Sequence, residues 1–284
     1  MNSWLVHSLL AVTAIGGMMA LYKVPAAKGH NKFTYSFLSF LVAAILSAII
    51  FRNDIAIEHD AILFGSLWGL GFAFVAMLQM ELLRKLDTNA VFPVTSLSSH
   101  VLIVIIGLSF FHDQISLLQM LAIMLTFIIG GFYNKIHGSI SWKNGLLPMA
   151  ACLVVLSTTT KFIQKFGAIT IEMHNFIFWQ LAFATLASFI IMLFVRRKEP
   201  GNRMKFSREM LWWSIGLGAL NFISNVELVK ALSTGPFSLV YTINSFYILI
   251  TSLIAWKFFG EELTKRKVFF LLAAIFAVIL IGLG

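Results

Sequence analysis

The stretch FFGEELT at residues 258–264 decides the fold, because a similar stretch, FFHDQIS, occurs at residues 110–116. Both turns lie between two long apolar segments, and the similarity continues upstream, where ELLR at 81–84 recurs as ELVK at 227–230. The offset between matching residues grows in order along the chain, from about 138 positions to about 148, as loop insertions would produce. Chance similarity between apolar segments would not keep this register, so the chain contains an internal repeat.

The two repeats extend over residues 1–137 and 138–284, and each contains five apolar segments long enough to cross a bilayer as helices. An odd number of spans forces the second repeat to enter the membrane upside down relative to the first, which is the inverted-repeat plan of secondary transporters. The predicted fold class is an all-α integral membrane protein with ten transmembrane helices in two inverted five-helix repeats. The expected spans are roughly 3–22, 34–52, 60–84, 90–110, 115–134, 144–165, 174–195, 209–230, 237–257 and 267–283.

Composition supports the membrane assignment independently. Hydrophobic residues make up 59% of the chain, charged residues only 12%, and the mean hydropathy is +0.90, which leaves too little polar surface for a soluble globule of 284 residues. Segments this long and apolar must be helices, because a lipid-exposed backbone has to satisfy its own hydrogen bonds. The first segment lacks a basic leader, so we interpret it as a membrane helix and not as a cleaved signal. We therefore expect a multi-pass protein of the cell (inner) membrane, with the lipid bilayer as its surroundings.

The orientation follows from the basic residues. Seventeen of the 21 Lys and Arg fall in the connections after the odd-numbered spans, and the positive-inside rule places these connections in the cytoplasm. Both termini are then expected outside the cytoplasm. The net charge of +9 reflects this topology and contact with anionic lipid. Nucleic-acid binding is not expected, because the basic residues are spread over short loops with no folded module to present them.

The FFGEELT turn is followed by a last apolar span that ends in IGLG at 281–284, its partner lies around Asp113, and ALST at 231–234 precedes the ninth span. In these features the chain resembles the drug/metabolite transporter superfamily, EamA-like branch. The resemblance covers nearly the whole chain as two tandem repeats. It implies a ten-helix carrier with a central cavity that moves small metabolites by alternating access.

Polar residues at membrane depth are the candidates for a substrate cavity, since they are expensive there unless paired or hydrated. Tyr241 and Asn244 share one face of the ninth span, and the repeat relates this face to Ser96 and His100 in the fourth span, which gives a polar stripe across the repeat interface. These side chains either line a cavity or hold the helices together by hydrogen bonds. The complete set of cavity candidates is Ser96, His100, Trp179, Gln180, Asn221, Asn225, Tyr241 and Asn244.

A second set of candidates concerns ion coupling and gating. His100 could carry a proton, because the charge of histidine changes near physiological pH, or it could simply donate to a carbonyl. Glu81 with Arg84 and Glu227 with Lys230 are i, i+3 pairs near the ends of the third and eighth spans, where they could form structural ion pairs or a gate latch.

Three further charged residues carry expectations of their own. Lys161 either extends its ammonium toward the interface or faces the cavity and attracts an anion. Asp113 and Glu261 precede the fifth and tenth spans and are expected to cap those helices.

Enzyme signatures are missing from the sequence. It contains no HExxH, no phosphate-binding GxxxxGK, no Cys/His metal spacing and no GxSxG, so we predict no catalytic residues, no cofactor and no metal. The leading hypothesis is a secondary transporter, not driven by ATP, for a small polar metabolite such as an amino acid, with export as the expected direction and protons as a candidate coupling ion. The alternative is a lipid-handling or structural membrane protein without a soluble substrate. The substrate's identity, the coupling ion and the oligomeric state lie beyond the sequence.

Overall fold

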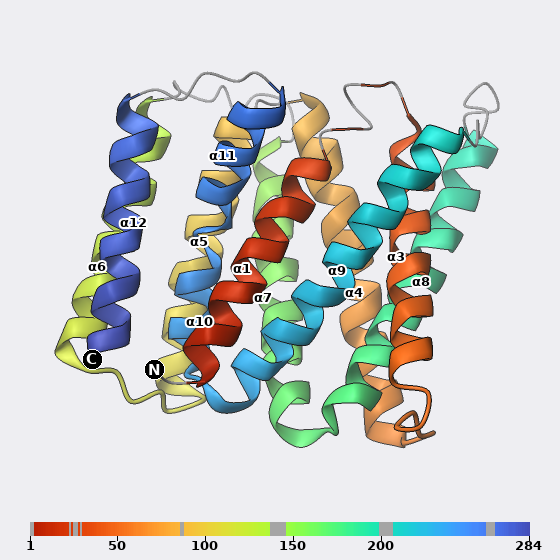
Figure 1. The fold of residues 1–284 in the computed structure, drawn as a ribbon, viewed down its shortest axis with the longest axis horizontal. Coiled ribbons are helices and arrows are strands. Elements are labelled where there is room, and N and C mark those ends of the chain that lie inside the picture. The colour runs from red at the N-terminus through yellow and green to blue at the C-terminus, as the bar shows by residue number, and fades with distance from the viewer. Residues whose placement is uncertain are drawn as a thin grey trace.

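The computed structural model describes residues 3–22, 24, 28, 30–85, 88–136, 146–198, 207–259 and 265–284. The described residues form helices joined by short connections (Figure 1). Their bounds are α1 Ser3–Leu21, α3 Lys32–Ile50, α4 His59–Lys85, α5 Thr88–Ser109, α6 Leu117–Ile136, α7 Leu146–Thr170, α8 Met173–Lys198, α9 Arg208–Thr234, α10 Phe237–Asn244, α11 Tyr247–Phe259 and α12 Lys265–Leu283.

These helices account for the ten expected spans. Within the described residues, seven segments are long and apolar enough to cross a membrane: α1, α3, α4, α7, α8, α9 and the combined α10–α11 segment. Shorter apolar stretches in α5, α6 and α12 supply the remaining three. Large apolar side chains are widely exposed on the outer surface, as expected where lipid replaces water as the solvent, and they include Ile49, Val155, Phe194, Trp212 and Leu283. The all-helical, multi-span fold class is confirmed.

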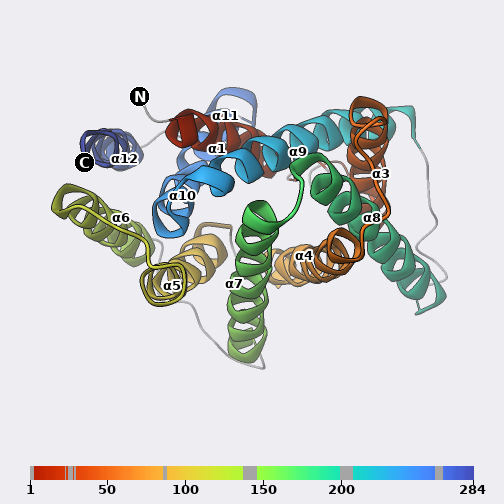
Figure 2. The same cartoon turned by 90° about the horizontal axis from the view of Figure 1, so that it is seen from below.

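The packing of the helices follows an inverted repeat. The repeat pairs α1, α3, α4, α5 and α6, in that order, with α7, α8, α9, α10–α11 and α12. Under this pairing the α1–α9 contact corresponds to the α4–α7 contact, and the α4–α8 contact corresponds to the α3–α9 contact. In the α3–α8 and α6–α12 contacts each helix packs against its own counterpart in the other repeat, and these two contacts lie at opposite ends of the bundle (Figure 2). Such an exchange of partners is what a two-fold axis in the membrane plane produces. The boundary between the repeats at residues 137 and 138 lies outside the described residues and stays a prediction.

Both termini lie on the same face of the bundle (Figure 1). The ends of α1, α4, α6, α8 and α11 lie on the opposite face, and in the sequence these ends are followed by the segments that contain seventeen of the basic residues.

Two elements differ from their expected spans. The sixth span was expected to end at residue 165, but α7 continues to Thr170 because Gln164 and Lys165 are buried among other helices instead of facing the membrane surface. The ninth span is interrupted at Ser245 and Phe246, which separate α10 from α11. Phe246 donates its N–H to the Ile243 carbonyl, three residues back, so the last turn of α10 tightens before the chain changes direction.

Candidate functional site

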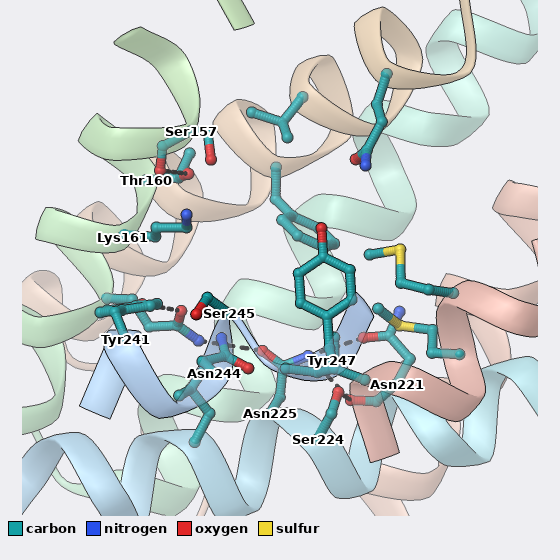
Figure 3. Close-up of a pocket in the computed structure, with 18 of the residues that line it drawn as sticks. Ser157, Thr160, Lys161, Asn221, Ser224, Asn225, Tyr241, Asn244, Ser245 and Tyr247 are labelled. Atoms are coloured by element: carbon teal, nitrogen blue, oxygen red, sulfur yellow. Dashed lines mark hydrogen bonds between the residues drawn. The ribbon is translucent and has the colours of Figure 1, made fainter. Parts of the chain in front are cut away.

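A cavity of about 140 Å³ lies between the two repeats, near the middle of the helices that surround it. Its walls come from α1, α4 and α5 of the first repeat and from α7, α9, α10 and α11 of the second. Figure 3 shows Lys161 and Thr160 on one side, Asn221 and Ser224 on another, and the α10–α11 break between them. The volume is large enough for a small metabolite or for several water molecules.

Two polar stripes form one half of the wall. On α7 the cavity contacts residues at i, i+3, i+4 and i+7, namely Ser157, Thr160, Lys161 and Gln164. On α9 the same spacing brings Asn221, Ser224, Asn225 and Leu228 to the cavity. This spacing places each set on a single helical face, so the two helices turn polar faces toward a common space.

Buried amides join these stripes in a hydrogen-bond network. The Tyr241 hydroxyl donates to Gln164 Oε1 at 3.0 Å, and Gln164 Nε2 donates to Asn225 Oδ1 at 3.2 Å. Gln180 Nε2 donates to the same Asn225 oxygen at 3.0 Å, while Asn225 Nδ2 donates to Asn221 Oδ1 at 2.8 Å. The network connects α7, α8, α9 and α10, so it fixes the relative positions of four helices around the cavity.

Not every polar atom is satisfied. Within the described part of the chain, Asn221 Nδ2, Asn244 Oδ1 and Gln180 Oε1 are buried without a hydrogen-bond partner. Asn221 and Asn244 line the cavity directly, whereas Gln180 lies behind it. A buried polar atom without a partner costs about 1–3 kcal/mol. A polar ligand in the cavity would remove that cost for Asn221 and Asn244.

His100 links the first repeat to the broken helix of the second. Its Nε2 lies 2.6 Å from the Tyr241 carbonyl oxygen, and since a carbonyl accepts, this nitrogen carries the proton. The imidazole also lines the cavity. His100 therefore holds the last turn of α10 at the place where the helix is interrupted.

The other half of the wall is mostly apolar, with Gln79 on α4 as a polar residue in it. Trp68 and Phe72 on α4 stack with ring centroids 4.6 Å apart and planes inclined by 12°. Ile15 and Met18 on α1 extend this surface. The cavity is therefore two-sided, with hydrogen-bonding groups facing aromatic and aliphatic side chains, as is typical of small-molecule sites.

The structure brings five of the eight cavity candidates to the cavity wall: His100, Asn221, Asn225, Tyr241 and Asn244. Gln180 is fully buried behind the wall and bonds to Asn225. Trp179 lies away from the cavity and donates its indole N–H to the Ala56 carbonyl at 3.0 Å. The side chain of Ser96 lies outside the described residues.

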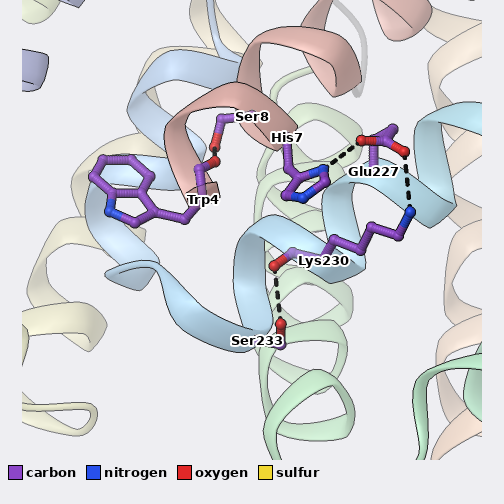
Figure 4. Close-up of polar contacts among 6 residues, drawn as sticks. All are labelled: Trp4, His7, Ser8, Glu227, Lys230 and Ser233. Carbon is purple, nitrogen blue, oxygen red and sulfur yellow. Dashed lines mark hydrogen bonds and ion pairs between the residues drawn. The ribbon is translucent and has the colours of Figure 1, made fainter. Parts of the chain in front are cut away.

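The coupling and gating candidates lie apart from the cavity, except for His100. Glu227 on α9 accepts from His7 Nδ1 on α1 at 2.6 Å and lies 3.5 Å from Lys230 Nζ (Figure 4). The Glu227 side chain is only 15% exposed, so this cluster joins α1 to α9 in a partly desolvated place. Glu81 lies 3.5 Å from Lys32 Nζ on α3, while the side chain of Arg84 lies outside the described residues.

Asp113 does not cap its own helix. Its carboxylate accepts from the Phe237 and Ser238 backbone N–H groups at 3.1 and 2.8 Å, and from the Ser238 hydroxyl at 2.6 Å. It therefore caps α10, on the opposite repeat, where the free N–H groups and the helix dipole favour a carboxylate. Glu261 lies outside the described residues.

Gln164 is the most important cavity residue that the sequence reading missed. It is 3% exposed, and it joins Tyr241 to Asn225. The sequence has six polar residues between positions 157 and 164, and four of them, at i, i+3, i+4 and i+7, share one helical face. The expected span 144–165 places position 164 next to its end.

The side chains around the cavity offer groups that bind a ligand. The described residues contain no cluster of three or more His, Cys, Asp or Glu that could hold a metal ion. The cavity residues offer amide, hydroxyl, imidazole and ammonium groups that can bind and orient a ligand.

Comparison with known proteins agrees with this geometry. The model of the EamA-like transporter family matches residues 143–283. A solved crystal structure of a protein with 12% sequence identity superposes with a TM-score of 0.76, over 98% of this chain and 98% of that one, which shows a common fold. The curated proteins contain no match to the chain. Residues 143–283 therefore belong to the EamA-like transporter family, which is part of the drug/metabolite transporter superfamily.

Proposed function

We propose that this protein is a secondary transporter that carries a small polar metabolite across the cell (inner) membrane by alternating access, without ATP. The observation that carries the proposal is the cavity between the two repeats, lined by unpaired Asn221 and Asn244 atoms at membrane depth. Carriers built from inverted repeats bind their substrates at such interfaces near the midplane. Small carboxylates, amino acids among them, are the first compounds to test, and export is the direction we expect.

The interrupted ninth span supports this proposal. Discontinuous helices in carriers expose backbone groups at membrane depth, where they line the substrate site. Here the break at Ser245 and Phe246 adjoins three residues of the cavity wall, Asn244, Ser245 and Tyr247. A structural or lipid-handling protein has no comparable need for a broken helix beside a polar cavity.

We assign different roles to the titratable groups. His100 is the candidate coupling group, because it lines the cavity and holds the Tyr241 carbonyl. Glu227, with His7 and Lys230, is the candidate latch between α1 and α9, since it joins helices from the two repeats away from the cavity.

Transport is tested with purified protein in proteoliposomes and a panel of labelled amino acids and other polar metabolites, with and without a pH gradient. We expect one compound to move, and we expect Asn244→Ala to abolish its movement. Asn53→Ala is the matched control, because Asn53 is exposed in the α3–α4 connection. His100→Ala is expected to remove the response to the pH gradient. Well-folded protein that moves no compound would favour the lipid-handling or structural alternative.

Orientation is tested separately. We propose that both termini lie outside the cytoplasm, because seventeen of the 21 basic residues fall, in the sequence, in the segments that follow the odd-numbered spans. A single cysteine introduced at Asn53, in a Cys152→Ser background, should react with a membrane-impermeant maleimide in intact cells. Reaction only after the membrane is broken would reverse the assignment.

A further inference from the structure

Lys161 is a cation in the cavity without an acidic partner. It lies nine residues before the end of α7, or about 14 Å along the helix, so its side chain starts near the membrane centre. Its ammonium donates to the Ser99 hydroxyl at 3.1 Å and lies 5.5 Å from the centre of the Tyr241 ring. The cavity wall includes no Asp or Glu, and in the described part of the chain no carboxylate lies within 4 Å of this ammonium.

Lys165, one turn further along α7, shows what a structural lysine looks like in this protein. Its ammonium donates to the Leu232 and Gly235 carbonyls at 2.6 and 3.0 Å, and the Asp113 carboxylate attracts it. It therefore ties α7 to the α9–α10 turn through two backbone carbonyls. Among the described residues, Lys161 donates one hydrogen bond, to the neutral Ser99 hydroxyl, although an ammonium has three donors. Its remaining donors are available to the cavity.

We propose that the substrate is a small organic monoanion with a carboxylate at one end and an apolar body, and that Lys161 binds the carboxylate. This inference rests on the proposed transport function and narrows its substrate class. The apolar body would lie against the stacked Trp68 and Phe72 rings on the opposite side of the cavity. The unpaired Asn244 oxygen would suit a hydroxyl or amide donor on the substrate.

Charge balance favours a monoanion over related compounds. A monocarboxylate neutralises the single lysine charge, and buried charges are stable in a low-dielectric site only when paired. A zwitterionic amino acid would leave one net positive charge in the cavity, and an amine would leave two. A phosphate monoester would bring close to two negative charges to one lysine. The cavity wall offers only neutral acceptors for an added ammonium.

Four compounds with nearly the same body test the inference: 3-phenylpropionate, phenylalanine, phenethylamine and phenyl phosphate. Their binding to the full-length protein in nanodiscs is measured by isothermal titration calorimetry. We expect 3-phenylpropionate to bind at least about tenfold more tightly than the other three. Lys161→Gln should weaken that binding by about 10- to 100-fold, which is the range for a hydrogen bond to a charged group. Lys161→Arg should keep the preference for the carboxylate.

Lys257→Gln is the matched control, because it removes the same charge from an exposed position at the end of α11. Each variant is first checked for an unchanged melting temperature, and Lys161→Arg provides a charged variant if Lys161→Gln fails to fold. Equal binding of 3-phenylpropionate by wild type and Lys161→Gln would overturn the inference. So would tighter binding of phenylalanine or phenyl phosphate, or binding of none of the four. Transport of any compound from the wider panel would in those cases leave the proposed function standing.

Discussion

Gly69 on α4 allows a very close approach to α8, and its replacement gives a sharp test of the packing. A Cβ at position 69 would lie 2.6 Å from the Ala184 nitrogen, 2.7 Å from the Gln180 carbonyl oxygen and 2.8 Å from Phe183 Cβ. Two of these atoms are backbone and cannot rotate away. Gly65 makes a similar approach one turn earlier, so α4 carries the GxxxG spacing that lets membrane helices meet at short distance.

The magnitude follows from the geometry. Ordinary contact begins near 3.4 Å, so Gly69→Ala must move α4 and α8 apart by about 0.8 Å. Overpacking of a filled interface destabilises by about 1–3 kcal/mol. The better helix propensity of alanine stabilises by about 1 kcal/mol. We expect a net loss of up to about 2 kcal/mol in the free energy of unfolding. Because the contact includes the Gln180 backbone, ligand binding should weaken as well.

The assay is thermal unfolding of purified protein in detergent, monitored by size-exclusion chromatography after heating. Gly216→Ala on α9 is the control, because a Cβ there meets only Leu21 Cδ1 at 3.8 Å and gains the same helix propensity. Gly69→Ala should lower the melting temperature, and Gly216→Ala should raise it or leave it unchanged. Equal shifts in the same direction would refute the close-approach argument.

Three other perturbations test the polar contacts. Asn225→Leu should destabilise the protein by about 3 kcal/mol, because it leaves the Gln164 and Gln180 amides buried without their acceptor; an unchanged melting temperature would contradict the network. Asp113→Ala should cost about 1–2 kcal/mol through loss of the α10 cap, whereas Asp113→Asn should keep part of it; equal losses in chemical denaturation would argue against capping. His7→Ala should cost no more than about 1 kcal/mol but should change transport rates more than Lys230→Ala, since only His7 reaches α9 from another helix; equal rates for the two variants would remove the latch assignment.

The sequence was sufficient to predict the spans and their inverted arrangement. The repeat signal needs only local similarity and register, and an odd number of spans then determines the inversion. Contacts within one helix could also be predicted, since Glu227 and Lys230 are three residues apart and do meet. The contact of Glu227 with His7 could not be predicted, because His7 lies on α1, 220 residues earlier in the chain.

Long-range capping is beyond a local reading for a similar reason. Asp113 comes just before a helix, and every local rule makes it the cap of that helix. The structure pairs it with Phe237 and Ser238 instead, because α10 begins beside the α5–α6 connection and offers unpaired N–H groups there. A cap is set by whichever helix start lies nearest in space, and that depends on how the two repeats pack.

The break between α10 and α11 is the feature of the fold that local sequence patterns predict least well. Ser245 and Phe246 include neither Gly nor Pro, and the segment from 237 to 257 is apolar enough to be one helix. Contacts with the first repeat flank the break: the Tyr241 carbonyl accepts from His100 as well as from the Ser245 N–H, and the Thr251 hydroxyl on α11 lies 3.0 Å from the Gly16 carbonyl on α1 as well as 2.9 Å from the Tyr247 carbonyl of its own helix. The first repeat thus contacts both sides of the break. A break held this way can respond to a change in the packing of the repeats, which is the property that a carrier needs at its substrate site.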